Sequence, residues 1–261
     1  MKIHNLIIED YNKDYNKINN NIYKIEGWFY PPDICIFDFL LSTQNKLNIN
    51  GNLLEIGLWK GRSLFKILDY CKNNEILFGL DVGLKKQEIE SQYKNFNNIN
   101  RLKLICDFSD NISNYKEINN IRFCHIDGSH KGLIVYNDII NANNYTNDKT
   151  ILVLDDFTKD YISVLQAYYK AYFNNQTNFV PIIYTPAKMY LCNKNSYQLY
   201  YEEIKHNIVD FINSYNCDHE IKQITEHKNT NITDMFQIIT AYYDFFDRTC
   251  ENKYTLHIFK D

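Results

Sequence analysis

The chain has 261 residues, 45% of them hydrophobic, so it can bury a substantial core as one large α/β domain or two small ones. A net charge of −4, without a sustained run of Lys or Arg, argues against a nucleic-acid-binding surface. No apolar run approaches the roughly 18 residues of a membrane span, and the N-terminus does not resemble a secretory signal. Seven scattered cysteines without a C-x-x-C pair indicate buried free thiols. We therefore expect a cytoplasmic protein without a nucleic-acid or membrane partner.

Residues 1–50 are predicted to form an N-terminal arm followed by a helix. The first 26 residues are polar and Asn-rich. The prolines at 31 and 32 favour a helix start, and apolar residues recur at helical spacing over 33–46. This helix either lies over a cofactor as a lid or packs on the sheet, and the sequence leaves both options open.

The first predicted strand, 52–56, leads into a glycine turn and then an amphipathic helix. This order is typical of phosphate or nucleoside binding in doubly wound folds. The pattern here is Glu55-x-Gly57-x-x-x-Gly61, which lacks the two close glycines that let a pyrophosphate approach the backbone. It therefore disfavours a dinucleotide and favours a ligand with an amino or sulfonium group.

Two more predicted strands, 76–80 and 102–106, each end in an aspartate. Asp81 follows the glycine turn at a distance where a carboxylate can accept both ribose hydroxyls, although an ordinary turn acid would read the same way. A side chain at Asp107 would face an adenine if a nucleoside lay across the sheet edge. A helix is expected between these strands, over 84–97.

The strands predicted at 121–126 and 151–154 both end in carboxylates, namely Asp127 after the first and Asp155 and Asp156 after the second. A helix-length segment between them predicts a right-handed βαβ unit with parallel strands. The three carboxylates then meet at the carboxyl edge of the sheet, where open α/β folds bind ligands. Carboxylates this close require a cation or raised pKa values, and an oxygen-only cluster suits Mg²⁺.

The rest of the chain is predicted as shorter elements without a linker or an internal repeat. In order, they are a helix at 160–173, strands at 179–184 and 188–192 that form an antiparallel pair, helices at 200–215 and 231–249, and a strand at 254–259. We divide the chain into the arm and cap helix (1–50), a cofactor-binding core (51–195) and a C-terminal helical appendage (196–261).

The order of these motifs resembles the class I S-adenosylmethionine-dependent methyltransferases. The motifs are Leu-Leu-Glu-Ile-Gly-Leu-Trp-Lys-Gly-Arg-Ser at 53–63, Asp81, Asp107, His-Ile-Asp-Gly-Ser-His at 125–130, Asp138, and Leu-Asp-Asp-Phe at 154–157. Within that family, the chain looks most like the DG-x-H and DD group of Mg²⁺-dependent O-methyltransferases of sugars and natural products. The resemblance covers about residues 50–195. It implies a doubly wound, mostly parallel, seven-stranded Rossmann-like sheet with a helical C-terminal appendage.

The resemblance also implies roles for individual residues at the cofactor and metal sites. Around S-adenosylmethionine it implies Glu55, Gly57 and Gly61 at the methionine part, Ser63 near its carboxylate, Asp81 at the ribose, and Asp107 and Phe108 beside the adenine. Asp127, Asp155 and Asp156 would hold Mg²⁺, as in catechol O-methyltransferase. The third ligand in catechol-type enzymes is often Asn, so Asp156 departs from that pattern.

The predicted catalytic residues are His130 and Asp127. The metal would lower the pKa of a substrate hydroxyl and His130 would take the proton, or else His130 would only hydrogen-bond its own turn. His125 is expected to be a buried structural histidine, and Asp138 a solvated or capping acid.

The sequence leaves three functions open. The first is methyl transfer to a hydroxyl of a small polar acceptor such as a sugar or nucleotide-sugar, assisted by Mg²⁺. The second is transfer to nitrogen, or without metal, on the same fold. The third is a nucleotide-binding oxidoreductase or a non-catalytic nucleotide-binding module. Aromatic residues in the C-terminal helices make a homo-oligomer plausible.

Overall fold

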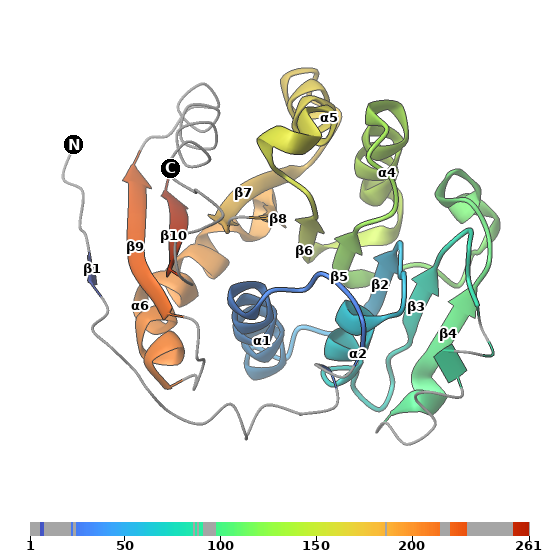
Figure 1. Ribbon diagram of the computed structural model, residues 1–261, viewed down its shortest axis with the longest axis horizontal. Helices are drawn as coiled ribbons and strands as arrows, with labels where there is room; N and C mark the ends of the chain where they lie inside the picture. Colours follow the sequence, from blue (N-terminus) through green and yellow to red (C-terminus); the bar gives the residue numbers. More distant parts are fainter. Residues whose placement is uncertain are drawn as a thin grey trace.

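The computed structural model describes residues 6–7, 22, 25–85, 87, 89–90, 98–185, 187–214, 220–228 and 253–260. Within these residues a ten-stranded sheet runs across the molecule, with helices on both faces (Figure 1). The strand order is β1-β9-β10-β7-β8-β6-β5-β2-β3-β4.

Five parallel strands form the half of the sheet that carries the predicted motifs. They are β2 (Asn52–Ile56), β3 (Leu77–Leu80), β4 (Leu102–Ile105), β5 (Ile121–Ile126) and β6 (Thr146–Leu154). Every residue of β5 is buried, as expected for a parallel strand covered on both faces. Ile126 pairs with Ile56 on one side and Leu154 on the other, so the carboxyl ends of three strands lie level at one edge. The predicted strands and their parallel order are confirmed.

Helices cover the two faces of the sheet and bury the alternating side chains of its strands. They are α1 (Pro31–Lys46), α2 (Arg62–Leu68) and α6 (Tyr197–Ser214) on one face and α4 (Gly132–Tyr145) and α5 (Ile162–Phe173) on the other. Short 3-10 turns lie at Ile99–Arg101 (η3), Ser109–Asn114 (η4), Lys159–Tyr161 (η5) and Lys194–Ser196 (η6). Each face has its own hydrophobic cluster. Leu53 packs in the cluster under α1, α2 and α6, and Leu54 packs in the cluster under α4 and α5, which is the period-two alternation of a strand.

The other half of the sheet is largely antiparallel. It contains β8 (Met189–Asn193), β7 (Phe179–Tyr184), β10 (Lys253–Lys260), β9 (Glu220–Lys228) and β1 (Leu6–Ile7). Strand β8 pairs with β6 and β7 in antiparallel fashion, which confirms the predicted hairpin. Among the described residues the sheet has ten strands in place of the seven predicted, and the run β4-β3-β2-β5-β6-β8-β7 is a seven-stranded part of it.

The predicted helical C-terminal appendage is wrong in one respect, because strands β9 and β10 from that region extend the sheet beyond β7. The sequence of β9, EIKQITEHK, has too few apolar residues to mark a buried strand, so its pairing with β10 was not foreseen. The predicted strand at 254–259 is confirmed within β10, and the predicted helix at 200–215 within α6. The predicted helix at 231–249, most of that at 84–97 and most of the arm lie outside the described residues.

Helix α1 packs on the sheet and does not act as a lid over it. Its residues Ile34, Phe37 and Leu41 are fully buried in the same cluster as α2 and α6. The alternative that places this helix against the sheet is therefore the correct one, while the predicted domain boundaries stay a prediction. Among the described residues, no helix is long and apolar enough to cross a membrane.

The described cysteines are free thiols, as predicted, but they are not all buried. Cys35, Cys71, Cys124 and Cys192 lie in the interior, whereas Cys106 is exposed at the end of β4.

Asp138 is buried inside the interface between α4 and the sheet, so the expectation of a solvated acid is wrong. Its side chain accepts a hydrogen bond from Ser109, and its Oδ2 atom has no partner. Burial raises its pKa to about 7, against the opposing hydrogen bond from Ser109, and the Asp110 carboxylate adds a smaller rise. The sequence did not reveal the burial of Asp138, because an acidic residue in the middle of a helix is usually predicted to lie on the surface.

Replacing Asp138 by Asn should stabilise the protein at pH 8 and change little at pH 4. The folded-state pKa lies above the ordinary value of 3.8, so stability from this group is present below that value and is lost as the pH rises through about 7. The amide keeps the neutral form, and the gain at pH 8 should reach about 3 kcal/mol. Urea unfolding at the two pH values measures it, with Asp148→Asn at an exposed position as the control. An equal gain at both pH values would contradict the assignment.

Candidate active site

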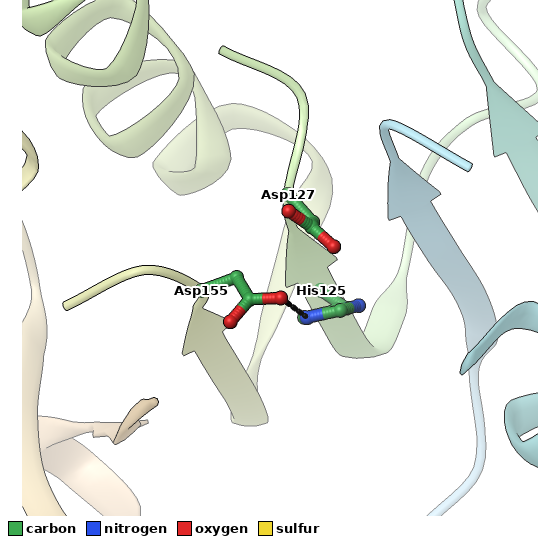
Figure 2. A group of neighbouring side chains, drawn as sticks. All are labelled: His125, Asp127 and Asp155. Carbon is green, nitrogen blue, oxygen red and sulfur yellow. Dashed lines mark ion pairs between the residues drawn. The ribbon is translucent and has the colours of Figure 1, made fainter. Parts of the chain in front are cut away.

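The backbone ladder of the sheet brings Asp127 and Asp155 together just beyond the ends of β5 and β6. The Asp127 amide donates to the carbonyl of Ile56 at 2.7 Å, and the Asp155 amide donates to the carbonyl of Ile126 at 3.0 Å. The pairing therefore continues one residue past each strand and fixes the two side chains in register. Figure 2 shows both at the ends of neighbouring strands, with His125 beside them.

Asp155 lies against a buried lysine that the sequence analysis did not single out. The Lys188 ammonium forms an ion pair with Asp155 Oδ2 and lies 3.3 Å from His125 Nε2. His125 Nε2 is itself 3.8 Å from the same carboxylate oxygen (Figure 2). Burial raises the pKa of Asp155, but Lys188 and His125 outweigh it and hold that pKa below its ordinary value. Asp155 is thus the ionised member of the cluster.

Asp127 is the opposite case, although it lies next to Asp155. Burial and the neighbouring Asp155 carboxylate raise the pKa of Asp127 well above its ordinary value, against the attraction of Lys188. A hydrogen bond between the two side chains acts in the same directions, since it raises the pKa of Asp127 and lowers that of Asp155. Within the pair, the pKa of Asp127 is raised and that of Asp155 is lowered, so a proton is favoured on Asp127 over Asp155.

Lys188 is held in place from the start of α1 and from the turn before β8. The Thr185 amide donates to the Lys188 carbonyl, and the Lys188 amide donates to the Thr185 hydroxyl oxygen. The Thr185 hydroxyl itself donates to Asp33 Oδ1 at 2.5 Å. Tyr190 donates to the same oxygen at 2.9 Å. Burial raises the pKa of Asp33, and Lys188 opposes that rise. The pKa of Lys188 stays above its ordinary value, because Asp155, Asp127 and Asp33 outweigh the cost of burial.

His130 and Asp156 form a second, more exposed pair at the same edge. His130 Nε2 lies 2.5 Å from Asp156 Oδ2, and the His130 ring packs on Tyr161 at a centroid distance of 4.2 Å. Asp156 has a φ of +50°, a conformation that aspartate tolerates better than most residues, and it turns the side chain toward His130. Burial and Asp155 raise the pKa of Asp156, with His130 opposing.

The three predicted metal ligands divide between two overlapping groups. Among the described residues, ligand atoms lie within 4.8 Å of one another in an inner group of His125, Asp127 and Asp155 and in an outer group of Asp127, His130 and Asp156. The inner group already contacts the Lys188 ammonium. A divalent ion placed there would face a positive charge at contact distance, which disfavours binding.

Glu55 lies fully buried at the end of β2, on the cofactor side predicted from the sequence. Its Oε1 accepts hydrogen bonds from Ser63 at 2.5 Å and from His125 Nδ1 at 2.7 Å. Its Oε2 is buried without a partner. A buried carboxylate oxygen of this kind is costly unless a ligand supplies a donor, and an ammonium group meets that need.

The turn after β2 brings the backbones of two strands into contact at Gly57. This residue has a φ of +85°, and a Cβ atom there would lie 2.1 Å from the carbonyl oxygen of Asp127. Gly61 has a φ of +81° and begins α2, and Trp59 between them has a φ of +47°. A bulky residue in that region signals strain that the surroundings maintain, as is common at ligand sites.

Asp81 ties the glycine turn to the turn after β3. It accepts hydrogen bonds from the Leu58 and Gly83 amides, each at 2.7 Å. Its place at the edge of the sheet is the one expected, and its ribose contact stays a prediction.

Asp107 bonds mainly within its own segment. It accepts from Asn111 at 2.7 Å and from Tyr115 at 2.8 Å, and these bonds together with the Phe108 amide lower its pKa. The Phe108 ring is largely exposed and open to stacking. The adenine contact of both residues stays a prediction.

A strap of residues 25–33 crosses from the glycine turn to Lys188. Arg62 on α2 donates to the carbonyls of Ile25 and Gly27, each at 2.6 Å, and Phe29 lies 5.5 Å from the Lys188 ammonium. Between these anchors, Trp28 packs on Trp59 with a centroid distance of 5.8 Å, yet the two remain 70% and 62% exposed. The contact between Trp28 and Trp59 thus joins the strap to the glycine turn.

Comparisons with known proteins agree with this geometry. Residues 54–157 match the family model described as a methyltransferase domain. The O-methyltransferase from Bacillus cereus in complex with SAH is 14% identical and has a TM-score of 0.55, covering 68% of this chain and 93% of its own. The O-methyltransferase NovP is 13% identical with a TM-score of 0.52, covering 61% and 78%. No curated protein matches the sequence. The likeness shows the predicted Rossmann-like fold.

Replacing Gly57 by Ala should destabilise the protein and displace Asp127. The added methyl group would collide with the Asp127 carbonyl, and the positive φ would strain any side chain, so we expect a loss of about 3 kcal/mol in urea unfolding. Gly83→Ala is the matched control, because its Cβ would meet its nearest neighbour at 3.5 Å, which is ordinary contact. Equal stability of the two variants would show that the close approach at Gly57 is unimportant.

Proposed function

We propose that this chain, an S-adenosylmethionine-dependent methyltransferase of the class I fold, transfers its methyl group to an oxygen atom of a small polar acceptor. The observation that carries the proposal is the His130–Asp156 pair at the carboxyl edge, next to Asp127 and across from the glycine turn of the cofactor side. The match of residues 54–157 to a methyltransferase domain supports methyl transfer over the oxidoreductase and the non-catalytic binding module.

The cofactor side suits S-adenosylmethionine on the chemistry of its donors. The free Oε2 of Glu55 would accept from the amino group of the methionine part, and the backbone at Gly57 and Gly61 leaves room for a ligand close to the turn. Asp81 would accept from the ribose, and Phe108 would stack on the adenine. The cofactor supplies a methyl group on a positively charged sulfur, which leaves with the sulfur–carbon electron pair when an acceptor attacks the methyl carbon.

His130 is the proposed proton acceptor. Asp156 accepts the Nε2 proton, which fixes the tautomer and leaves the lone pair on Nδ1. Nδ1 would take the hydroxyl proton of the acceptor as the new oxygen–carbon bond forms. Asp127, whose raised pKa favours the neutral acid, would hydrogen-bond the acceptor and orient it for in-line attack.

A sugar-like acceptor is supported by the walls of this edge. Trp28 and Trp59 expose their ring faces on the strap and the glycine turn, and aromatic faces pack well against the apolar faces of sugar rings. An amine acceptor, the alternative, is less well supported because Lys188 already neutralises Asp155.

The predicted assistance by Mg²⁺ stays a prediction, and the donor set fits it poorly. In the inner group the ammonium of Lys188 stands where a divalent ion would contact Asp155 and His125. In the outer group His130 Nε2 is already engaged by Asp156 at 2.5 Å. No step of the proposed reaction therefore passes through a metal.

Glu55→Gln should weaken the binding of S-adenosylhomocysteine about 10- to 100-fold, because a charge-assisted hydrogen bond is replaced by a neutral one. The two tryptophans of the chain are Trp28 and Trp59, so intrinsic fluorescence reports on the mouth of the cofactor side and gives the dissociation constant. Glu117→Gln, at an exposed position paired with Lys103, is the control. Wild-type protein that binds no S-adenosylhomocysteine would overturn the cofactor assignment.

His130→Gln should lower kcat by about 100-fold or more while cofactor affinity stays unchanged, as expected for loss of a general base. Formation of S-adenosylhomocysteine with a panel of sugars and nucleotide-sugars measures the rate. His206→Gln is the matched control, because His206 pairs with Glu202 at 3.1 Å on the exposed face of α6. A wild-type rate in His130→Gln would exclude this residue as the proton acceptor.

A further inference from the structure

Lys188 is an uncommon residue for the interior of a protein. Its side chain is 1% exposed, and an ammonium so deeply buried is stable only where carboxylates compensate its charge. Asp155, Asp127 and Asp33 do so here, since all three act to keep the ammonium protonated. The lysine and its carboxylates are therefore one electrostatic unit.

The ammonium stands in the position that a metal ion would need. A divalent ion in the inner group would draw its ligands from His125, Asp127 and Asp155, and Lys188 Nζ already contacts Asp155 Oδ2 and His125 Nε2. An ammonium carries three donors and no acceptor, so it satisfies the same lone pairs that a cation would coordinate. Its single charge balances one carboxylate, that of Asp155, with which it forms an ion pair.

The surroundings fix the ammonium instead of leaving it mobile. The Lys188 amide donates to Thr185 Oγ1 at 3.2 Å, and the Thr185 amide donates back to the Lys188 carbonyl at 3.0 Å. Thr185 and Tyr190 in turn hold Asp33, and the Phe29 ring covers the ammonium from the strap. Three separate parts of the chain thus build a site for a cation that belongs to the protein.

We propose that the ammonium of Lys188 takes the place of a divalent cation at the Asp127–Asp155 pair, so that methyl transfer needs no metal. The inference rests on the proposed function and names a positioning residue of that same site. Lys188 acts through Asp155, whose charge it balances and whose side chain it holds beside Asp127.

The test measures Mn²⁺ binding by electron paramagnetic resonance, which needs no methyl transfer, and then activity. Wild-type protein should bind Mn²⁺ only weakly and keep its full rate after dialysis against EDTA. Lys188→Met should bind Mn²⁺ at least about tenfold more tightly than wild type, since the vacated carboxylates then form an acidic site. Its rate should fall at least about 100-fold and recover in part with added Mn²⁺. Lys188→Arg, which keeps the charge, should retain activity in EDTA.

Lys46→Met is the matched control, because Lys46 pairs with Glu203 at 3.0 Å on the surface, and its Mn²⁺ affinity should equal that of wild type. Tight Mn²⁺ binding by the wild type, or loss of its activity in EDTA with recovery in Mg²⁺, would overturn the proposal. If Lys188→Met does not fold, these wild-type measurements decide alone. Failure to bind S-adenosylhomocysteine would instead overturn the proposed function. The Mn²⁺ titration does not depend on cofactor binding, so the two failures can be told apart.

Discussion

The buried ion pair between Lys188 and Asp155 sets the chemistry of the whole carboxyl edge. Parallel pairing of β5 and β6 forces Asp127 and Asp155 together, and two ionised carboxylates at that distance would repel strongly. The ammonium relieves this repulsion by stabilising the charge on Asp155, whose pKa is lowered, while the pKa of Asp127 is raised. Around this pair, the positions of His125, Asp33 and the start of α1 follow from the need to satisfy a buried charge.

Much of the cofactor side was predictable because its signals are local in the sequence. A buried strand, a turn with Gly57 and Gly61, and an amphipathic helix are adjacent in the chain, so their spacing determines their geometry. The same holds for Asp127, Asp155 and Asp156, which follow predicted strands directly. The parallel order of the strands then requires their ends to meet, and the structure has them meet.

The side of the site proposed to bind the acceptor, around Asp155 and Lys188, was not predictable to the same degree. Its contacts join segments that lie far apart in the sequence. Lys188 begins a run that reads as an ordinary strand, and Asp33 follows two prolines, where an acid reads as a helix-start residue. Only the antiparallel return of β8 beside β6 shows that these side chains meet Asp155. The sequence motif could indicate that three neighbouring carboxylates need a cation. It could not indicate that Lys188 supplies that cation, because Lys188 lies far from the motif in the sequence.

The two sides of the site are linked at Gly57, and this contact limits how the edge can vary. The backbone of the glycine turn touches the backbone of Asp127, so a shift on the cofactor side would be transmitted to the acceptor side within one residue. Glu55 adds a second link, since its Oε1 holds His125 while its Oε2 is buried without a partner and is the proposed acceptor for the cofactor. His125 in turn contacts the Lys188 ammonium. A ligand that engages Glu55 therefore acts on the same chain of contacts that positions Asp155, which places cofactor binding and acceptor geometry in one connected network.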